Sequence, residues 1–421
     1  MIFYFLFIRI AALFGHRKAR LLVRGQAETI PALAAQSQPA AGKGPVWIHA
    51  ASAGEFEQAR PLIERIKAQH PQQKIVVTFF SPSGYELRKD YGLADGVYSL
   101  PFATRRNAKR FLNALQPRMA FFIKYEFWPA YIRELKKRDI PFYSVSSIFR
   151  PGQVFFRLWG KGQLRLLRAF TRLYVQDEAS QRLLAGHGVH NASVAGDTRF
   201  DRVESITRSL ASQAGLDERL APVAEFAEGC QRLIVAGSTW HKDEQLLARY
   251  MSAASYPLPA KLILVPHETD EAHLHFIFNL FKGRFVRYSD ASRMTSAVSR
   301  RNLLGRAQVL LIDTVGLLSS VYRFGQAAYV GGGFGEGIHN TIEAAVYGLP
   351  VVFGPNYHTF REAQGLIDAG AARSVSRFSE LENALNTALD RHEEIGAKAA
   401  AYVQSELGAT DRIYTELFGN S

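Results

Sequence analysis

The feature of this sequence that most constrains its fold is a glycine-rich stretch in the C-terminal half, from Ala328 to Pro355. An apolar run ends at Val330, glycine occupies five of the next seven positions, and a helical pattern continues to Gly348. The order strand, glycine loop, helix and strand is typical of an α/β protein, in which a backbone without Cβ atoms can turn tightly or approach a ligand. The stretch is not a Gly-x-Gly-x-x-Gly pattern followed by a long helix, so it does not fit a dinucleotide fingerprint. No Walker lysine follows, so it does not fit a P-loop.

Polar side chains gather where the helix of this stretch is expected to begin. Asn340 is a good N-cap, and Glu343 follows three residues later, as a capping box requires. The first-turn N–H groups of such a helix suit an anion, and His339 adds a further polar group for sugar hydroxyls or phosphate. A purely structural role remains open, because α/β proteins commonly need glycine where a strand turns into a helix.

Length, charge and cysteine content narrow the class of protein. A chain of 421 residues is too long for one ordinary core and fits two α/β domains. The formal charge of +13 and the isoelectric point near 9.7 predict an anionic partner, which is nucleic acid, an acidic membrane face or a phosphorylated substrate. Cys230 is the only cysteine, so there is no disulfide framework, and without a cysteine or histidine cluster we expect no metal site.

The N-terminal residues form an apolar run with a basic end. Residues 1–14 are apolar apart from Arg9, and a helix of this length reaches about 20 Å against a hydrocarbon core of about 30 Å. We predict that residues 1–24 form a membrane-associated helical segment, the alternative being an apolar helix packed on its own domain. Residues 25–45 are predicted to be a loose linker. The basic residues that follow the run, instead of preceding it as in a secretory signal, are Arg17, Lys18, Arg20 and Arg24.

Apolar runs alternate with helical patterns in two series, which predict two Rossmann-like domains with parallel sheets. The first series covers residues 45–205 and the second covers residues 230–421, with the last helix either staying in the second domain or returning to the first. Residues 202–230, helical and charged, would join the two. Ligands lie at the carboxyl ends of the strands in open α/β sheets, so we expect a cleft where the two domains face each other.

Five stretches, taken together and in order, resemble the lipid A Kdo transferases, which move 3-deoxy-D-manno-octulosonic acid (Kdo) from CMP-Kdo onto a lipid A precursor. The resemblance extends over nearly the whole chain and is carried by Trp47-Ile-His-Ala-Ala-Ser-Ala-Gly-Glu55, Glu126-Phe-Trp-Pro129, Gly237-Ser-Thr239, Asp313-Thr-Val-Gly316 and His339-Asn-Thr-Ile-Glu343.

The resemblance implies a GT-B fold, with the acceptor side in the first domain and the nucleotide side in the second. It also implies an inverting transfer in lipopolysaccharide biosynthesis, without a metal or a cofactor, at the cytoplasmic face of the cell inner membrane. The implied partners are CMP-Kdo, a lipid A precursor of the lipid IVA type and the anionic membrane surface, and not nucleic acid.

The resemblance also assigns roles to residues. Glu55 is similar to the family's general base, while Glu126 and Arg199 stand where the family has groups that stabilise the transition state. The segments that match its CMP-contacting residues contain Pro266, His267, Val315, Gly316, Leu317, Asn340, Thr341, Ile342 and Glu343.

The chain departs from the family pattern at several positions, which indicates a divergent branch. Arg199 replaces the usual lysine, which keeps the charge but changes the geometry. The segment Pro266–Glu271 lacks an arginine that the family has there. Ile338 stands in place of a glycine, and Lys124 stands where an acid is common.

Taken without the resemblance, the same residues have structural interpretations. Ser52 and Glu55 form a complete capping-box pattern, so the Glu55 carboxylate could simply close a helix start. Glu126 could be a buried carboxylate that caps a strand end, and Arg199 could be a solvated surface charge. With the resemblance, Glu55 would instead accept the proton of a sugar hydroxyl that attacks the anomeric carbon opposite the leaving CMP.

Two other functions are compatible with parts of the sequence. A transferase or an epimerase that uses a UDP-sugar would keep the same two-domain fold. A membrane-tethered basic protein that binds nucleic acid would account for the charge, but the sequence has no helix-turn-helix, no RNP-type aromatic motif and no dense basic run.

Overall fold

The computed structural model describes residues 2–35, 44–157, 160–212, 217–253, 260–282 and 284–419. The chain divides into two compact units. The first unit contains Met1–Arg202 and Glu406–Ser421, and the second contains Val203–Ser405.

The first unit is built on a seven-stranded sheet in the order β3-β2-β1-β4-β5-β6-β7, and every pair of neighbouring strands is parallel. The chain order reverses between β1 and β4, which makes this the topological switch point of the sheet. The strands are β1 (Val46–Ala50), β2 (Ile75–Phe79), β3 (Gly96–Ser99), β4 (Met119–Ile123), β5 (Phe142–Ser147), β6 (Arg172–Val175) and β7 (Ala192–Val194).

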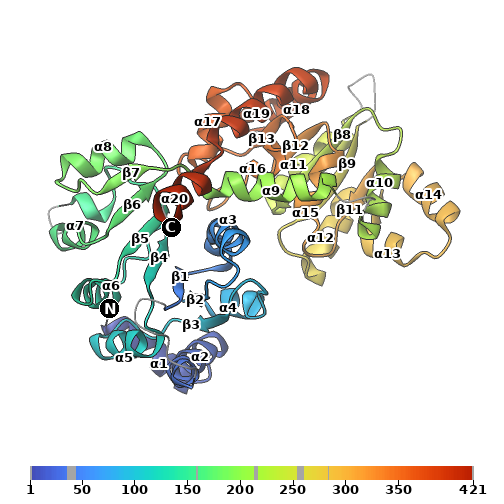
Figure 1. Cartoon of the computed structure of the whole chain (residues 1–421). Coiled ribbons are helices and arrows are strands. Elements are labelled where there is room, and N and C mark those ends of the chain that lie inside the picture. The colour runs from blue at the N-terminus through green and yellow to red at the C-terminus, as the bar shows by residue number, and fades with distance from the viewer. Residues whose placement is uncertain are drawn as a thin grey trace. The chain divides into compact units, whose positions relative to one another are not determined.

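Helices cover both faces of this sheet (Figure 1), so the central strands are buried on both sides. In β1, Trp47 packs into the core on one face, while Val46 and Ile48 pack into the core on the other. The helices are α1 (Ile2–Leu13), α2 (Arg17–Ala34), α3 (Ala53–Gln69), α4 (Pro82–Arg88), α5 (Arg105–Leu115), α6 (Pro129–Lys137), α7 (Lys161–Leu167), α8 (Glu178–Gly186) and α20 (Ala409–Phe418), with a 3₁₀ turn at Val154–Phe156.

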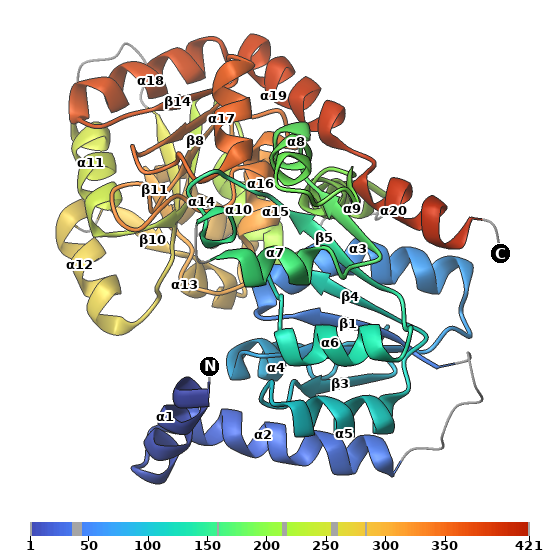
Figure 2. The ribbon, with the colours of Figure 1, turned by 90° about the vertical axis from the view of Figure 1, so that its left-hand side faces the viewer.

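The predicted linker at residues 25–45 is wrong for its first ten residues, because α2 continues to Ala34. The helix packs beside α5 and the edge strand β3, as Figures 1 and 2 show. Thr29 is buried and its hydroxyl donates a hydrogen bond to the Ser99 carbonyl, and Leu33 is also buried. Gly25 and Pro31 suggested a loop, but tertiary burial of one helix face outweighs their low helix propensity. Residues 36–43 lie outside the described part of the chain.

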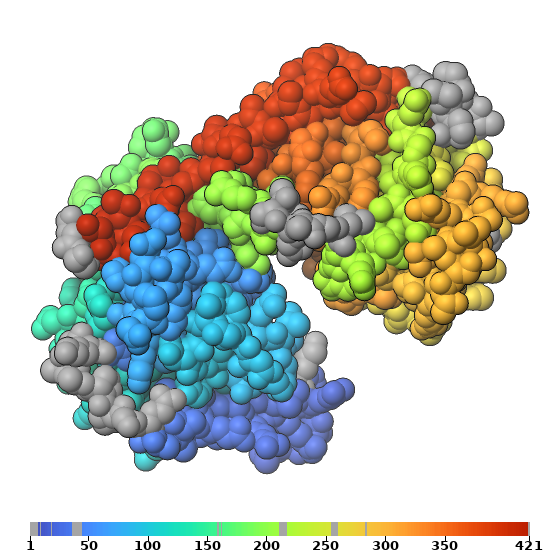
Figure 3. Space-filling model, turned by 45° about the vertical axis from the view of Figure 1, so that its right-hand side comes forward, coloured from blue at the N-terminus to red at the C-terminus, as the bar shows by residue number. Residues whose placement is uncertain are grey.

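The helix α1 forms as the sequence predicts, and it contacts α2. Figure 3 shows these two helices, in dark blue, on the surface of the first unit. Several large apolar side chains of this region are exposed, namely Phe7 (69%), Ile10 (42%), Leu13 (81%) and Phe14 (89%). Within the described residues, no helix has both the length and the apolar character needed to cross a bilayer. The side chains of Arg9 and Lys18 lie outside the described ones.

The C-terminal helix α20 belongs to the first unit. The Asp201 carboxylate, in the first turns of α9 (Thr198–Ser212), accepts hydrogen bonds from the Gly408 and Thr410 amides. Tyr414 adds a hydrogen bond to His70 at the end of α3, with a separation of 3.0 Å between the Tyr hydroxyl and Nε2. These contacts attach the end of the chain to the unit that contains its beginning.

The second unit repeats the same design with a seven-stranded parallel sheet in the order β10-β11-β9-β8-β12-β13-β14. Its chain order reverses between β8 and β12, which is the second switch point. The strands are β8 (Leu233–Thr239), β9 (Lys261–Pro266), β10 (Phe285–Arg287), β11 (Val309–Leu311), β12 (Ala327–Val330), β13 (Val351–Phe353) and β14 (Ala372–Ser374).

The helices of the second unit again lie on both faces of its sheet (Figure 1). They are α10 (Ala221–Ala227), α11 (His241–Ser252), α12 (Glu271–Phe281), α13 (Tyr288–Arg293), α14 (Ala297–Arg306), α15 (Leu318–Val321), α16 (Ile342–Ala345), α17 (Arg361–Asp368), α18 (Phe378–Asp390) and α19 (His392–Glu406), with 3₁₀ turns at Glu218–Leu220 and Tyr322–Phe324.

Candidate functional site

In the first unit, two of the three predicted site residues, Glu55 and Glu126, lie at the switch point. Glu55 is in the first turn of α3, directly after β1, and Glu126 follows β4, the neighbouring strand. Ligand sites of open α/β sheets form at this edge, where the loops after two central strands run in opposite directions. The position of both carboxylates therefore follows from the strand order, and it brings together two residues that are far apart in the sequence.

The Glu55 carboxylate is held by the backbone of the loop that precedes its helix. Its Oε2 accepts a hydrogen bond of 2.7 Å from the Ala51 amide, while the Ser52 hydroxyl caps the helix by accepting from the Glu55 amide. The capping contact thus forms, although Glu55 bonds to Ala51 and not to the N-cap amide. Burial, and then the negative charge of Glu126, raise the pKa of Glu55 above its ordinary value, against the lowering effects of the Ala51 bond and of Lys124 and His49.

Glu126 belongs to a three-residue cluster that the sequence reasoning did not assign. Its Oε2 accepts a 2.7 Å hydrogen bond from the indole nitrogen of Trp128 and lies 3.1 Å from Nε2 of His49. His49 is fully buried in β1, and the Glu126 side chain is only 14% exposed. The contact between Glu126 and His49 of β1 agrees with the interpretation of Glu126 as a buried carboxylate at a strand end. The same contact also places an imidazole beside Glu126.

His49 makes hydrogen bonds through both ring nitrogens. Nδ1 lies 3.0 Å from the Thr78 carbonyl oxygen and 2.9 Å from the Thr78 hydroxyl. Nε2 lies 3.1 Å from the Glu126 carboxylate and 3.2 Å from the Trp128 indole nitrogen. These contacts fix the orientation of the imidazole beside Glu126.

Arg199, the third predicted residue of this side, is bound to Asp197 at the start of α9. Its guanidinium donates through Nε and a terminal nitrogen to Asp197 Oδ2, at 2.9 and 2.6 Å. Asp197 is 1% exposed, and its Oδ1 accepts from the Gln58 amide on α3. Burial by itself raises the pKa of Asp197, but the Arg199 charge and these hydrogen bonds hold it below its ordinary value. The solvated-charge interpretation of Arg199 is therefore wrong.

In the second unit, the segments predicted to contact CMP follow strands of one sheet edge. Pro266 and His267 follow or end β9, residues 315–317 come after β11, and residues 340–343 come after β12. Since β11, β9, β8 and β12 are consecutive in the sheet, their carboxyl ends are neighbours. Val315 is 91% exposed, while Leu317 and Thr341 are buried.

The Glu343 carboxylate connects residues 340–343 to α15, the helix that follows residues 315–317. Its Oε1 accepts a 3.0 Å hydrogen bond from the Asn340 side-chain amide, and its Oε2 accepts a 2.6 Å bond from Ser319 on α15. Asn340 Oδ1 accepts from the Ile342 amide, but the N-cap position is taken by Thr341, and α16 is a single turn. The prediction of a longer helix capped by Asn340 is therefore wrong. The helix ends at Ala345, before Gly348, whose φ of +68° is left-handed.

Three rings stack at the same edge of this sheet. His267 lies between Trp240 and His339, with ring centroids 4.7 and 4.5 Å apart. The Trp240 indole donates to His339 Nε2 at 3.1 Å, so the remaining ring nitrogen of a neutral His339 carries the hydrogen. Burial, and then the nearby His267, lower the pKa of His339 to about 4. His339 is therefore a neutral donor at neutral pH.

The glycines of the loop after β12 are needed for packing against the protein itself. A Cβ at Gly331 would lie 2.3 Å from the Ser238 carbonyl oxygen, and Gly332 has a φ of +91°. The amides of these two residues donate to Gly237 O and to the buried Asp243 carboxylate. These two amides are thus engaged within the unit, and the structural interpretation of this part of the loop is the correct one.

Both edges contain non-glycine residues in left-handed backbone conformations. Lys124, at the end of β4, has a φ of +53°, Ser146 in β5 has +58°, and Ser238 in β8 has +53°. Such conformations cost about 1–3 kcal/mol each and persist where the surrounding structure fixes them. Ser238 coincides with a register shift between β8 and β9, and Ser146 with one between β5 and β6.

Three members of these sites were not predicted from the sequence, namely His49, Trp128 and Trp240. His49 and Trp128 stood inside motifs that were quoted, but an isolated aromatic or histidine in an apolar run is more often a core residue. The available signal for His49 was its position as the one ionisable side chain of a strand buried on both faces.

Among solved structures, the chain is similar to the UDP-GlcNAc 2-epimerase of Neisseria meningitidis bound to UDP-GlcNAc, with a TM-score of 0.63 and 15% identity over 89% of this chain and 100% of that one. A UDP-N-acetylglucosamine 2-epimerase of Listeria monocytogenes, described as putative, gives 0.61 and 14% over 90% and 97%. Such identities establish the fold alone. The chain is an α/β protein of the GT-B-like class, with two parallel seven-stranded sheets.

Sequence comparison shows which transferases the chain is similar to. A family model described as 3-deoxy-D-manno-octulosonic-acid transferase (kdotransferase) matches residues 18–202. The 3-deoxy-D-manno-octulosonic acid transferase of Haemophilus influenzae is 27% identical over 87% of this chain and 85% of its own length, and that of Aquifex aeolicus is 28% identical over 84% and 88%. The chain is thus similar, over most of its length, to 3-deoxy-D-manno-octulosonic acid transferases.

Proposed function

We propose that this protein is a Kdo transferase that moves Kdo from CMP-Kdo onto a lipid A precursor in lipopolysaccharide biosynthesis. The observation that carries the proposal is the carboxylate pair Glu55 and Glu126 at the switch point of the first unit, within the residues that the family model matches. In this proposal, both carboxylates take part in an inverting sugar transfer.

In this proposal, Glu55 is the general base. Its Oε2 is anchored by the Ala51 amide, so Oε1 can accept the proton of an acceptor sugar hydroxyl. The hydroxyl oxygen then forms a bond to the anomeric carbon of Kdo as the bond from that carbon to the CMP phosphate breaks. A base is most effective when its pKa lies near the working pH, and burial together with the Glu126 charge moves the pKa of Glu55 in that direction.

Glu126 and Arg199 assist this step in the proposed mechanism. The negative charge of Glu126, whose Oε2 lies 3.1 Å from His49 Nε2, favours the positive charge that develops on the sugar ring. Arg199 has a fixed orientation because Asp197 binds two of its nitrogens. We assign it to the stabilisation of developing negative charge, for which a positioned guanidinium is suited.

The second unit would bind the CMP part of the donor. His339 offers a neutral N–H, and each oxygen of Glu343 keeps a second lone pair for a ribose hydroxyl. The Trp240–His267–His339 stack adds flat aromatic surface beside these groups. The proposed donor contacts are Pro266, His267, Val315, Gly316, Leu317, Asn340, Thr341, Ile342 and Glu343.

Incubation of the purified protein with CMP-Kdo and a lipid A precursor, followed by mass spectrometry of the lipid, tests this function. The expected result is a lipid heavier by one or more Kdo residues, together with free CMP. UDP-N-acetylglucosamine serves as the control donor, because the fold is shared with its 2-epimerases. Turnover of that compound without any Kdo transfer would contradict the proposal.

We further propose that α1 and α2 attach the enzyme to the anionic inner-membrane surface on the cytoplasmic side. Exposed apolar side chains at the end of α1 can enter the lipid, and they are followed by exposed basic residues, Arg17, Arg20 and Arg24. Each such cation adds about 1 kcal/mol near an anionic leaflet. The lipid acceptor is presented at the same surface.

Vesicle flotation with anionic lipids tests the attachment. Leu13→Ser combined with Phe14→Ser, or deletion of residues 1–14, should reduce the bound fraction, and high salt should reduce it for the unaltered chain. The matched control is Leu87→Ser, which removes a 63% exposed leucine from α4. Equal binding of the double variant and the control would contradict the attachment.

A further inference from the structure

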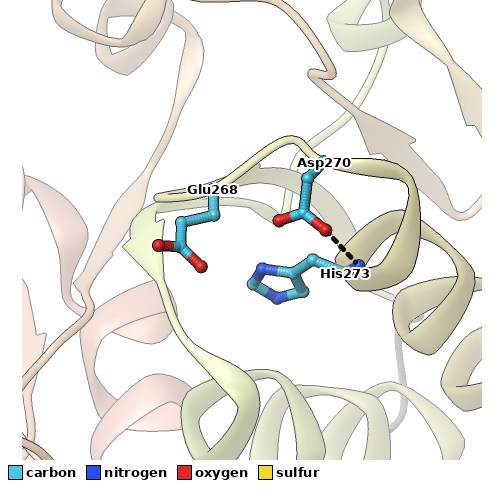
Figure 4. Close-up of side chains that lie close together, drawn as sticks. All are labelled: Glu268, Asp270 and His273. Atoms are coloured by element: carbon cyan, nitrogen blue, oxygen red, sulfur yellow. Dashed lines mark hydrogen bonds between the residues drawn. The ribbon is translucent and has the colours of Figure 1, made fainter. Parts of the chain in front are cut away.

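We propose that Glu268, Asp270 and His273 form a binding site for one divalent transition-metal ion, with Zn²⁺ the best fit. The three residues lie in the loop after β9 and in the first turn of α12, and one ligand atom from each lies within 4.8 Å of the others. Figure 4 shows both carboxylates on the same side of the His273 ring, facing one of its nitrogens.

The hydrogen bonds of His273 prepare one ring nitrogen as a ligand. Nε2 lies 2.8 Å and 3.0 Å from the two oxygens of Glu244, a fully buried carboxylate that can only accept from it. Nε2 therefore carries a hydrogen, and a neutral imidazole then has its lone pair on Nδ1. Histidine ligands of metals commonly donate their second N–H to a carboxylate in this way, which fixes the ring and its tautomer.

The Nδ1 atom of His273 is buried and has no hydrogen-bond partner among the described residues. The residue is 3% exposed, so this nitrogen is not left to bulk water. Buried polar atoms nearly always have a partner, and this one faces the two carboxylates of the group. A cation between the three side chains would satisfy the nitrogen.

The ring cannot easily turn away from this position. Its face stacks on His241 with the centroids 4.5 Å apart, and Glu244 is in turn fixed by the Thr239 hydroxyl. Asp270 is also constrained, because its Oδ1 accepts from the Ala272 and His273 amides as the N-cap of α12. Its other oxygen remains for a ligand bond, and the exposed Glu268 can adjust to complete the set.

The donor set selects the class of ion. One imidazole and two carboxylates match Zn²⁺ better than Mg²⁺ or Ca²⁺, which prefer oxygen ligands alone. Bonds of about 2.0–2.1 Å place tetrahedral ligands about 3.4 Å apart, so the ligand atoms need to approach one another by up to about 1.4 Å, with water as a fourth ligand. This group has one histidine and no cysteine, so it does not form the cysteine or histidine cluster whose absence from the sequence predicted no metal site.

The ion would have a structural role, since it would join the loop after β9 to the first turn of α12. Glu268 directly follows His267, so the ion would also restrict the backbone beside the stack of Trp240, His267 and His339. The inference does not depend on the proposed transferase activity, because it concerns metal binding alone.

Titration calorimetry with Zn²⁺ on the full chain, with Mg²⁺ in parallel, tests the proposal. We expect one Zn²⁺ site that Mg²⁺ does not occupy, and a rise in melting temperature on Zn²⁺ addition. Glu268→Gln and Asp270→Asn should each weaken Zn²⁺ binding at least tenfold, and the double variant should lose the site. Both substitutions keep the side-chain size, and asparagine can still cap α12.

The matched control is Glu271→Gln, which neutralises the neighbouring exposed carboxylate and should leave Zn²⁺ affinity within twofold. Glu244→Gln, which disturbs only the partner of His273, should weaken binding about tenfold to a hundredfold. Equal Zn²⁺ binding by the unaltered chain and by the double variant would overturn the proposal. An equal loss in Glu271→Gln would also overturn it, since the effect would then come from general charge.

Discussion

The two units share one strand order but differ in what stands at the switch point. The first unit has two carboxylates and an imidazole in contact with one of them. The second unit has a stack of three rings, a neutral histidine and an amide–carboxylate pair. Under the proposed function, the same strand order provides both sites, and the side chains at each one assign proton transfer to the first unit and nucleotide recognition to the second.

Burial acts on both sites in the same physical direction and yields different chemistry. Removing a charged group from water disfavours its charged form, so the pKa of Glu55 rises and that of His339 falls to about 4. The result is a stronger base in the first unit and an uncharged hydrogen-bond donor in the second. Exchanging the two functions would require different residues, although the folds are alike.

The largest expected effect is that of Glu55→Gln on the first site. Glutamine keeps the size and can still accept from Ala51, but it cannot take a proton, so the transfer rate should fall by about 10²–10⁴. The rate is measured with saturating CMP-Kdo and lipid acceptor, and Glu86→Gln on α4 is the exposed control. A rate near that of the control would remove Glu55 from the base role. A large loss of melting temperature would favour the capping interpretation.

Arg199→Met tests whether this arginine belongs to the framework of the first site. It leaves the buried Asp197 carboxylate without its main partner, so the free energy of unfolding should fall by about 3–5 kcal/mol. The control is Arg208→Met, also on α9, whose 77% exposed side chain pairs with Glu204 and should cost at most about 1 kcal/mol. Urea denaturation measures both. Equal stability of the two variants would contradict the pairing.

Asn340→Ala and Glu343→Ala probe the second site. Each removes hydrogen bonds worth about 1 kcal/mol, so CMP affinity should fall about five- to tenfold, while binding of the lipid acceptor should not change. Asn383→Ala, at an exposed position of α18, is the control. Calorimetry with CMP gives the affinities, and unchanged values in both variants would return this region to a structural role.

The smallest expected effect is a shift in pH dependence that only the first site should show. The base must be deprotonated, so the transfer rate should rise with pH through the pKa of Glu55. Glu126→Gln removes a negative neighbour that raises this pKa, so the acidic limb of the profile should move to lower pH. If the acidic limb stays in place or moves to higher pH, the proposed effect of the Glu126 charge on the pKa of Glu55 would be contradicted.

Much of the fold could be predicted from the sequence, for a definite reason. Strands of a parallel sheet covered on both faces are continuous apolar runs, as in β1 and β4, so their positions are readable without knowledge of the partners. The strands β10 and β14 give a weaker sequence signal, because they are three residues long and only partly buried. Residues 25–34 of α2 were not predicted to be helical, because the stability of this part of the helix comes from packing on α5 and β3.

The candidate sites were predictable only in part. Glu55 and Glu126 were named through motifs, but the contact between Glu126 and His49 joins residues 77 positions apart and leaves no local pattern. The Arg199–Asp197 pair is local in sequence, yet the burial of Asp197 depends on Gln58, 139 residues away. Spacing could not show that Gly331 and Gly332 serve internal packing, because that follows from their contacts with β8 and α11.

The central claim is that proton transfer resides in the first unit and nucleotide recognition in the second. Its most direct test is to compare the CMP affinities of Glu55→Gln and Asn340→Ala by calorimetry. If proton transfer and nucleotide recognition reside in different units, Glu55→Gln should bind CMP within about twofold of the unaltered chain despite its loss of activity, and Asn340→Ala should bind more weakly. A loss of CMP affinity in Glu55→Gln equal to or greater than that in Asn340→Ala would contradict this account.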